Sequence, residues 1–96
     1  MPQATRFGDN CTGHDACPPV PLVTASDNVF INGQGAGRIN DLYATHSCDV
    51  HPPHQDNIAQ GSATVFINGR HAGRIGDPVV LAGAVADGSG NVFIGP

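Results

Sequence analysis

A short apolar segment occurs three times in this chain and constrains its fold more than any other feature. Val29-Phe30-Ile31-Asn32-Gly33 returns unchanged as Val65-Phe66-Ile67-Asn68-Gly69 and, shortened, as Val92-Phe93-Ile94-Gly95. Upstream of each copy lies a second phrase, which reads Arg6-Phe7-Gly8-Asp9, Arg38-Ile39-Asn40-Asp41 and Arg74-Ile75-Gly76-Asp77. A chain that repeats one unit in this way is expected to fold with approximate threefold symmetry. We predict a single domain over 1–96, with repeat units at about 6–33, 38–69 and 74–95, and a threefold partner.

The composition argues against long helices and favours an all-β fold. Every positively charged side chain is Arg and every acidic one is Asp, so Lys and Glu, two of the better helix formers, are absent. The chain also contains 13 Gly and 8 Pro. The Val-Phe-Ile runs suit strands, and the Asn-Gly after two of them suits the positive φ angles of a type I′ turn. We expect two β-hairpins, with return strands at 34–39 and 70–75.

The third Val-Phe-Ile run has no return strand after it, because the sequence ends at Pro96. The segment Thr5-Arg6-Phe7-Gly8-Asp9 resembles a return strand, but no Val-Phe-Ile run comes before it. We expect these two segments to pair and so to close the threefold set. The Arg and Asp of each upstream phrase are expected to bond to one another and to the backbone, which would fix the loop that follows.

Net charge and hydropathy argue against several classes of function. The formal net charge is −4 and the Arg residues do not cluster, so a nucleic-acid partner is not expected. No apolar run approaches the roughly 18–20 residues that cross a bilayer. The first residues lack the basic and apolar regions of a signal peptide. We expect a protein made in the cytoplasm that leaves, if at all, by a route that needs no signal peptide.

Histidine and cysteine concentrate in two of the three variable loops, at 10–25 and 42–60. The first contains Cys11-Thr12-Gly13-His14-Asp15-Ala16-Cys17, the second His46-Ser47-Cys48-Asp49-Val50-His51-Pro52-Pro53-His54, and only His71 lies elsewhere. Thiolate and imidazole are donors of tetrahedral Zn²⁺ sites. His46, Cys48 and a later His, with His14 from the first loop, would fill all four positions. A closed site of this kind is structural.

Spacing alone does not fix the donors of the predicted zinc site. His51 competes with His46 or His54, and Cys17 competes with His14. The choice among these histidines and cysteines stays open at this point.

The cysteines are expected to be reduced, with at least one thiolate bound to metal. Three cysteines fit a closed disulfide framework poorly, although Cys11 and Cys17 can pair across a short loop. Cys48 near histidines also resembles an activated nucleophile. No orienting residue, oxyanion loop or substrate pocket is readable, however, so an enzyme is not expected. The alternative function is a free-standing small zinc-binding protein.

The order of these motifs resembles the PAAR-repeat proteins, over nearly the whole chain from Arg6 to Gly95. In that family a Pro-Ala-Ala-Arg tetrapeptide follows the strand turn, and the matching tetrapeptides here are Gly35-Ala36-Gly37-Arg38 and His71-Ala72-Gly73-Arg74. The opening Gly8-Asp9-Asn10-Cys11-Thr12-Gly13-His14 is similar to short members found with phage-type contractile tails. The resemblance implies a small conical domain of short strands and hairpins, with a metal ion at its tip.

The resemblance also implies a function. PAAR proteins cap and sharpen the trimeric β-helical spike of type VI secretion systems, phage tails and related machines for membrane puncture. Their tip holds Zn²⁺ through three His and one Cys, which correspond here to His14, His46, Cys48 and His54. The apolar side chains expected to contact the spike are Val29, Phe30, Val65, Phe66, Val92 and Phe93. Contact with a target membrane would be transient, and an effector would have to bind noncovalently.

Overall fold

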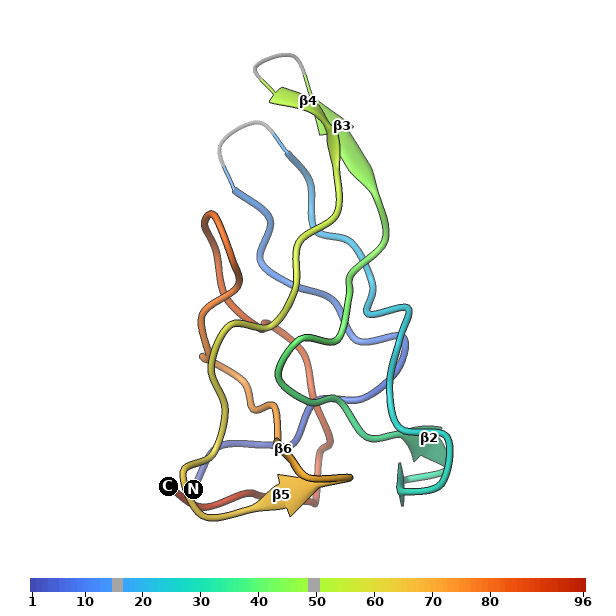
Figure 1. The fold of residues 1–96 in the computed structure, drawn as a ribbon, viewed down its shortest axis with the longest axis vertical. Coiled ribbons are helices and arrows are strands. Elements are labelled where there is room, and N and C mark those ends of the chain that lie inside the picture. The colour runs from blue at the N-terminus through green and yellow to red at the C-terminus, as the bar shows by residue number, and fades with distance from the viewer. Residues whose placement is uncertain (15–16, 49–50) are drawn as a thin grey trace.

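The structure, a computed structural model, describes residues 1–14, 17–48 and 51–96. Its strands are β1 (Phe30–Ile31), β2 (Gln34–Gly35), β3 (His46–Cys48), β4 (His51–His54), β5 (Phe66–Ile67) and β6 (Arg70–His71). They form three two-stranded antiparallel sheets, β1–β2, β3–β4 and β5–β6 (Figure 1). In these ranges no helix is long and apolar enough to span a bilayer. The predicted all-β class is confirmed.

Two of the sheets are the hairpins predicted from the Asn-Gly turns. The paired residues are Phe30 with Gly35, Ile31 with Gln34, Phe66 with His71 and Ile67 with Arg70. Asn32 and Gly33 have φ angles of 54° and 80°, and Asn68 and Gly69 have 55° and 76°, as a type I′ turn requires. The return strands end at Gly35 and His71, earlier than predicted, because the backbone from Gly37 and from Gly73 onward bonds to segments outside its own hairpin.

A ring of three backbone hydrogen bonds joins the units. The N–H of Thr5 donates to the carbonyl of Gly73 at 3.1 Å, Gly73 donates to Gly37 at 2.9 Å, and Gly37 donates to Thr5 at 2.9 Å. Each of these residues directly precedes one of the three Arg-to-Asp phrases. Equivalent positions therefore meet around the ring, while the symmetry of the whole chain stays a prediction.

The two ends of the chain pair as predicted, but through a different N-terminal segment. The partners are Gln3 with Phe93 in an antiparallel bridge, Ala4 N–H with the Val92 carbonyl at 3.0 Å, and Ile94 N–H with the Pro2 carbonyl at 2.9 Å. The expected partner segment, 5–9, is engaged elsewhere, because Thr5 belongs to the ring and Arg6 forms a bridge with Ala36. Each backbone group bonds once in such a ladder, so the pairing falls on residues 2–4.

Each upstream phrase folds into a clamp between its Arg and its Asp. The backbone N–H and Nε of Arg38 donate to Oδ2 of Asp41 at 2.8 and 2.9 Å, and Nη2 donates to Oδ1 at 3.0 Å. This side-chain hydrogen bond is the main cause that raises the pKa of Arg38. Asn40 has a φ of 71°, a left-handed value that explains why the other two phrases carry Gly there. The predicted structural role of the Arg–Asp pairs is confirmed, with Arg6–Asp9 and Arg74–Asp77 as the equivalents.

Two clusters of buried side chains form the core. The first gathers the Ile of each Val-Phe-Ile run with the Ala two residues before each Arg-to-Asp phrase, and its members are Ala4, Ile31, Ala36, Ile67, Ala72 and Ile94. The second consists of Cys11, Leu22, Tyr43, Ile58, Val79 and Val85. Side chains alternate along a strand, so burial of each Ile turns the preceding Phe outward. Phe30, Phe66 and Phe93 are accordingly 60%, 53% and 48% exposed.

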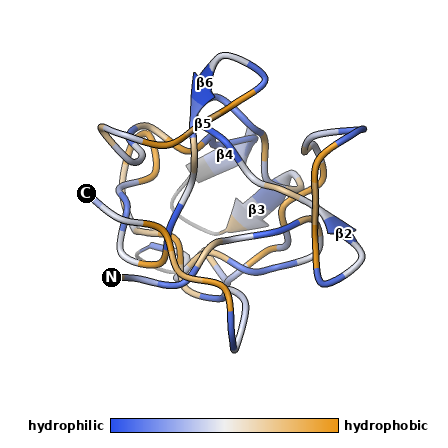
Figure 2. Cartoon of the chain, turned by 90° about the horizontal axis from the view of Figure 1, so that it is seen from below, coloured by the Kyte–Doolittle hydropathy of each residue, from blue (hydrophilic) through white to orange (hydrophobic). Residues whose placement is uncertain are grey.

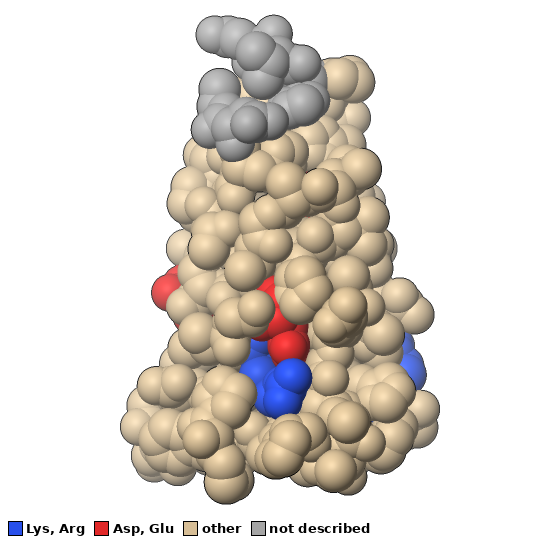
Figure 3. All heavy atoms as spheres, turned by 90° about the vertical axis from the view of Figure 1, so that its left-hand side faces the viewer, with Lys and Arg blue, Asp and Glu red and all other residues tan. Residues whose placement is uncertain are grey.

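The molecule is elongated, with principal extents of 37 × 24 × 23 Å. Figure 1 places β2, β5, β6 and both termini at one end, which we call the base, and β3 and β4 at the other. The described part narrows away from the base, and Arg and Asp side chains meet in its lower half on the face in Figure 3. The expected small conical domain is confirmed.

The base carries most of the predicted spike-binding side chains on its surface. Figure 2 looks onto this end and shows β2, β5 and β6 around the centre. Val29 and Val65 are each 36% exposed, next to the outward-facing Phe side chains. Val92 differs, because it is partly buried against the first core cluster.

Candidate metal centre

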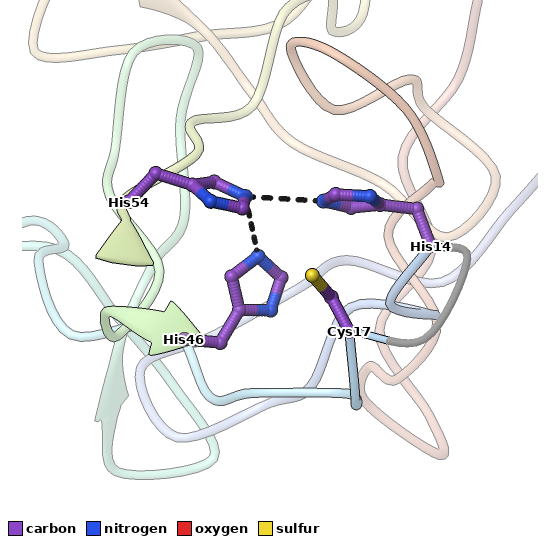
Figure 4. A group of neighbouring side chains, drawn as sticks. All are labelled: His14, Cys17, His46 and His54. Atoms are coloured by element: carbon purple, nitrogen blue, oxygen red, sulfur yellow. Dashed lines mark hydrogen bonds between the residues drawn. The ribbon is translucent and has the colours of Figure 1, made fainter. Parts of the chain in front are cut away.

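Three histidines converge towards the narrow end of the molecule. His46 lies on β3 and His54 on β4, and the antiparallel register pairs these two residues directly. His14 comes from the first variable loop, where it exchanges backbone hydrogen bonds of 3.1 and 2.7 Å with Cys17. Figure 4 shows the three rings and the Cys17 side chain pointing towards one another. One donor atom from each of these four residues lies within 4.8 Å of the other three.

Backbone carbonyls fix the tautomer of two of the rings. Nδ1 of His46 lies 3.1 Å from the carbonyl oxygen of Pro18, and Nδ1 of His54 lies 2.9 Å from that of Pro52. A carbonyl oxygen only accepts hydrogen bonds, so each Nδ1 is the donor, and the neutral ring presents the lone pair of its Nε2.

These lone pairs point into a small shielded space. The Nε2 atoms of His46 and His54 lie 2.8 Å apart, and Nε2 of His14 lies 3.2 Å from that of His54. The side chains of His14, His46 and His54 are only 7%, 3% and 18% exposed. Acceptors this close repel one another unless a proton or a cation lies between them. A buried cation shared by several donors satisfies all of them at once.

The cysteines differ from the prediction. Cys17 and Cys48 form a disulfide with Cα atoms 5.0 Å apart, and Cys11 is free and buried. The expectation of reduced thiols is therefore wrong for this pair, and Cys11 does not bond to Cys17. The reason is that β3 carries Cys48 to the first loop, so one bond and one buried thiol account for all three cysteines. Of the four predicted ligands, the three histidines come together, and Cys48 is bonded to Cys17.

The side chain of His51, which competed for a place in the predicted site, lies outside the described residues. Its backbone belongs to β4 and is paired with Cys48.

Sequence reasoning missed an acidic residue at the centre of the cluster. Oδ2 of Asp56 lies 3.2 Å from Nε2 of His14, 3.3 Å from that of His46 and 3.4 Å from that of His54. Asp56 is 4% exposed. One signal was available, because residues two apart on extended chain share a face, which places Asp56 beside His54.

The donors present suit a borderline-soft divalent ion. Three imidazole nitrogens with a sulfur or carboxylate oxygen form the donor set of tetrahedral zinc sites. These donors come from separate segments, the first loop and the β3–β4 hairpin with the chain after it. An ion bound here would therefore add a second cross-link between segments that the Cys17–Cys48 disulfide already joins.

Comparison with known proteins points to one family. The family model described as the PAAR motif matches residues 12–86. No curated protein matches the chain. The matched range contains all three convergent histidines, both cysteines of the disulfide and Asp56.

Proposed function

This chain belongs to the PAAR motif family, and from that membership we propose that it caps the blunt end of a trimeric β-helical spike in a contractile injection machine. The base would rest on the spike, and the narrow end would form the point that meets the target envelope. Such a part needs stiffness more than chemistry, since force reaches it from behind. The proposal therefore assigns the protein no catalytic step.

The exposed aromatic side chains of the base are the observation that carries this proposal. Phe30, Phe66 and Phe93 come from the three repeat units and are each about half exposed. Exposed apolar groups gathered at one end of a small domain mark an interaction surface. Three equivalent contacts offered by one chain suit a partner with three identical chains, because each chain of the trimer then meets the same kind of side chain.

The histidine cluster supports the second half of the proposal, a stiff tip. His14, His46 and His54 would hold a structural Zn²⁺, which supplies positive charge and links the first loop to the β3–β4 hairpin. The rings are already oriented for this, because Pro18 and Pro52 accept from two of the Nδ1 atoms. Pre-oriented imidazoles are typical of metal sites in proteins.

A binding experiment with the spike tests the proposal. The full chain, loaded with Zn²⁺, is mixed with the C-terminal end of a trimeric β-helical spike from the same organism, and the mass of the complex is measured by native mass spectrometry. We expect one copy of the chain for each spike trimer. A chain that binds zinc but forms no complex with this spike would contradict the proposal and support the alternative, a free-standing zinc-binding protein.

A further inference from the structure

Asp56 is held in place at the histidine cluster by its own backbone. Its carbonyl oxygen accepts a hydrogen bond of 2.9 Å from the N–H of Tyr43, a residue of the second core cluster that is fully buried. The backbone that carries the carboxylate is therefore bonded to the second core cluster. Its Oδ2 faces Nε2 of all three convergent histidines, within 3.4 Å of each.

The separations between Oδ2 of Asp56 and the three ring nitrogens match the edges of a tetrahedral coordination site. Four donors at about 2.0–2.1 Å from a zinc ion are about 3.3–3.4 Å from one another. The Nε2–Oδ2 separations are 3.2, 3.3 and 3.4 Å. The Nε2–Nε2 separations are 3.2 Å for His14 with His54 and 2.8 Å for His46 with His54. The donor atoms of His14 and His46 lie within 4.8 Å of one another.

The cysteines leave the fourth position to another donor. Sulfur binds zinc as a thiolate, and a sulfur in the Cys17–Cys48 disulfide carries no such charge. A carboxylate supplies both a negative charge and an oxygen that zinc accepts. It would also offset part of the ion's charge in a shielded place, where three neutral imidazoles offset none.

The other carboxylate oxygen of Asp56 supports the same conclusion. Oδ1 is buried, and no hydrogen-bond donor among the described residues reaches it. A buried carboxylate with an unsatisfied oxygen is costly, unless its charge is balanced by a cation close by. The only positive charge that the described surroundings of Asp56 offer is on the three rings themselves or on an ion between them.

We propose that Asp56 is a ligand of this centre, and that its Oδ2 completes a set of three nitrogens and one oxygen with His14, His46 and His54 while Cys17 and Cys48 are joined. The ion is a divalent cation that accepts tetrahedral nitrogen and oxygen donors, such as Zn²⁺ or Co²⁺. This inference rests on the metal site of the proposed function, and it does not depend on whether the base binds a spike.

Cobalt reports the donor set directly, since a thiolate ligand adds an intense charge-transfer band that imidazole and carboxylate ligands lack. The full oxidised chain is stripped of metal and titrated with Co²⁺ alone, after thiol counting has confirmed that only Cys11 is free. We expect one tetrahedral Co²⁺ per chain without the thiolate band. A strong thiolate band, or no binding of Co²⁺, would overturn the assignment.

Variants distinguish whether the carboxylate of Asp56 or a cysteine sulfur is the fourth ligand. We expect Asp56→Asn to lower the Co²⁺ affinity by at least about 100-fold, the upper range for changes just outside a metal's ligands. Asp87→Asn is the matched control, because Asp87 is exposed and binds the N–H of Asn10, and it should keep the wild-type affinity. Wild-type affinity in Asp56→Asn would overturn the proposal.

A double variant provides a second route should Asp56→Asn fail to fold. Cys17→Ser with Cys48→Ser removes both sulfurs and leaves the proposed donors in place. We expect it to bind Co²⁺ with the spectrum of the oxidised wild type. Loss of binding or a changed spectrum would assign the fourth position to sulfur and overturn the role of Asp56. Neither result bears on spike binding, which the mixing experiment measures separately.

Discussion

The Nε2 atoms of His46 and His54 lie 2.8 Å apart, although the opposite nitrogen of each ring donates to a backbone carbonyl. The two Nε2 atoms are both acceptors, and the hydrogen bonds on the far sides of the two rings hold them close together. The strands β3 and β4 that carry them are paired at this position, so the backbones of the two residues are held next to one another. The arrangement is favourable when a cation lies between the rings, and the stability of the domain should therefore depend on metal.

Removal of metal should destabilise the domain. A ligand at about 100 times its dissociation constant adds about 2.7 kcal/mol to stability, which for a domain of this size corresponds to roughly 10–20 °C in melting temperature. We expect the zinc-loaded chain to lose about this much when a chelator is added, as measured by calorimetry. His54→Ala should melt near the metal-free wild type and should not respond to chelator. Equal melting temperatures with and without metal would contradict the prediction.

Gly37→Ala should disturb the ring of backbone hydrogen bonds. A Cβ at Gly37 would lie 2.7 Å from Cγ2 of Thr5 and 2.9 Å from Cδ2 of Leu22, both closer than van der Waals contact. Overpacking of this kind costs about 1–3 kcal/mol, which urea unfolding measures. Gly90→Ala is the control, since a Cβ there meets nothing within 4 Å, and it should change stability little. A cost for Gly37→Ala no greater than that of the control would show that the ring tolerates displacement.

Tyr43 should make the domain sensitive to alkali. Burial is the main cause that raises the pKa of this side chain, and no partner among the described residues bonds its hydroxyl. Above about pH 10, the ordinary pKa of Tyr, the unfolded chain releases a proton that the folded chain retains. Stability should then fall by up to about 1.4 kcal/mol per pH unit, and it should be fully present below that pH.

Tyr43→Phe tests this dependence, because Tyr43 is the only tyrosine. The variant removes a buried hydroxyl without a partner, so we expect it to be at least as stable as the wild type at pH 7. The difference in urea stability should widen above pH 10. Parallel stability curves for the two proteins across this range would argue against a raised pKa for Tyr43.

Local features were predictable from the sequence because neighbouring residues determine them. The Asn32-Gly33 turn requires two positive φ angles that its own residues favour. The Arg38–Asp41 clamp likewise closes over three positions. The pairing of the chain ends was predicted from the missing return strand, but its register was not, because the ring at Thr5 decides which residues are left to pair.

Features that join distant segments were harder to predict. The Cys17–Cys48 disulfide spans 31 residues, and the number of cysteines alone argued against it. The histidine donors were recognised as a group from their spacing, whereas the one signal for Asp56, its position two residues after His54, does not by itself indicate a ligand. Its place beside His54 follows only once the chain after β4 is known to be extended. Residues that are brought together only by the tertiary fold could therefore be identified only from the structure.

The aromatic side chains of the base should be needed for spike binding and dispensable for folding. Phe30, Phe66 and Phe93 are each about half exposed, so replacing all three by Ser should cost less than about 1 kcal/mol per site in stability, close to the range of surface changes. A buried aromatic anchor contributes about 2 kcal/mol or more to an interface, so each single change to Ser should weaken spike binding roughly 30-fold. Titration of the spike with each variant measures this affinity.

Leu81→Ser is the matched control for these changes. Leu81 is 76% exposed, more than any of the three Phe, but it lies in the loop 78–87, which bonds to the first variable loop through Thr12 and Ala84. Loss of this apolar side chain should leave spike affinity unchanged, because the loop lies away from the base. A triple Phe variant that binds the spike as tightly as wild type, or a control that loses binding equally, would move the docking surface away from the base.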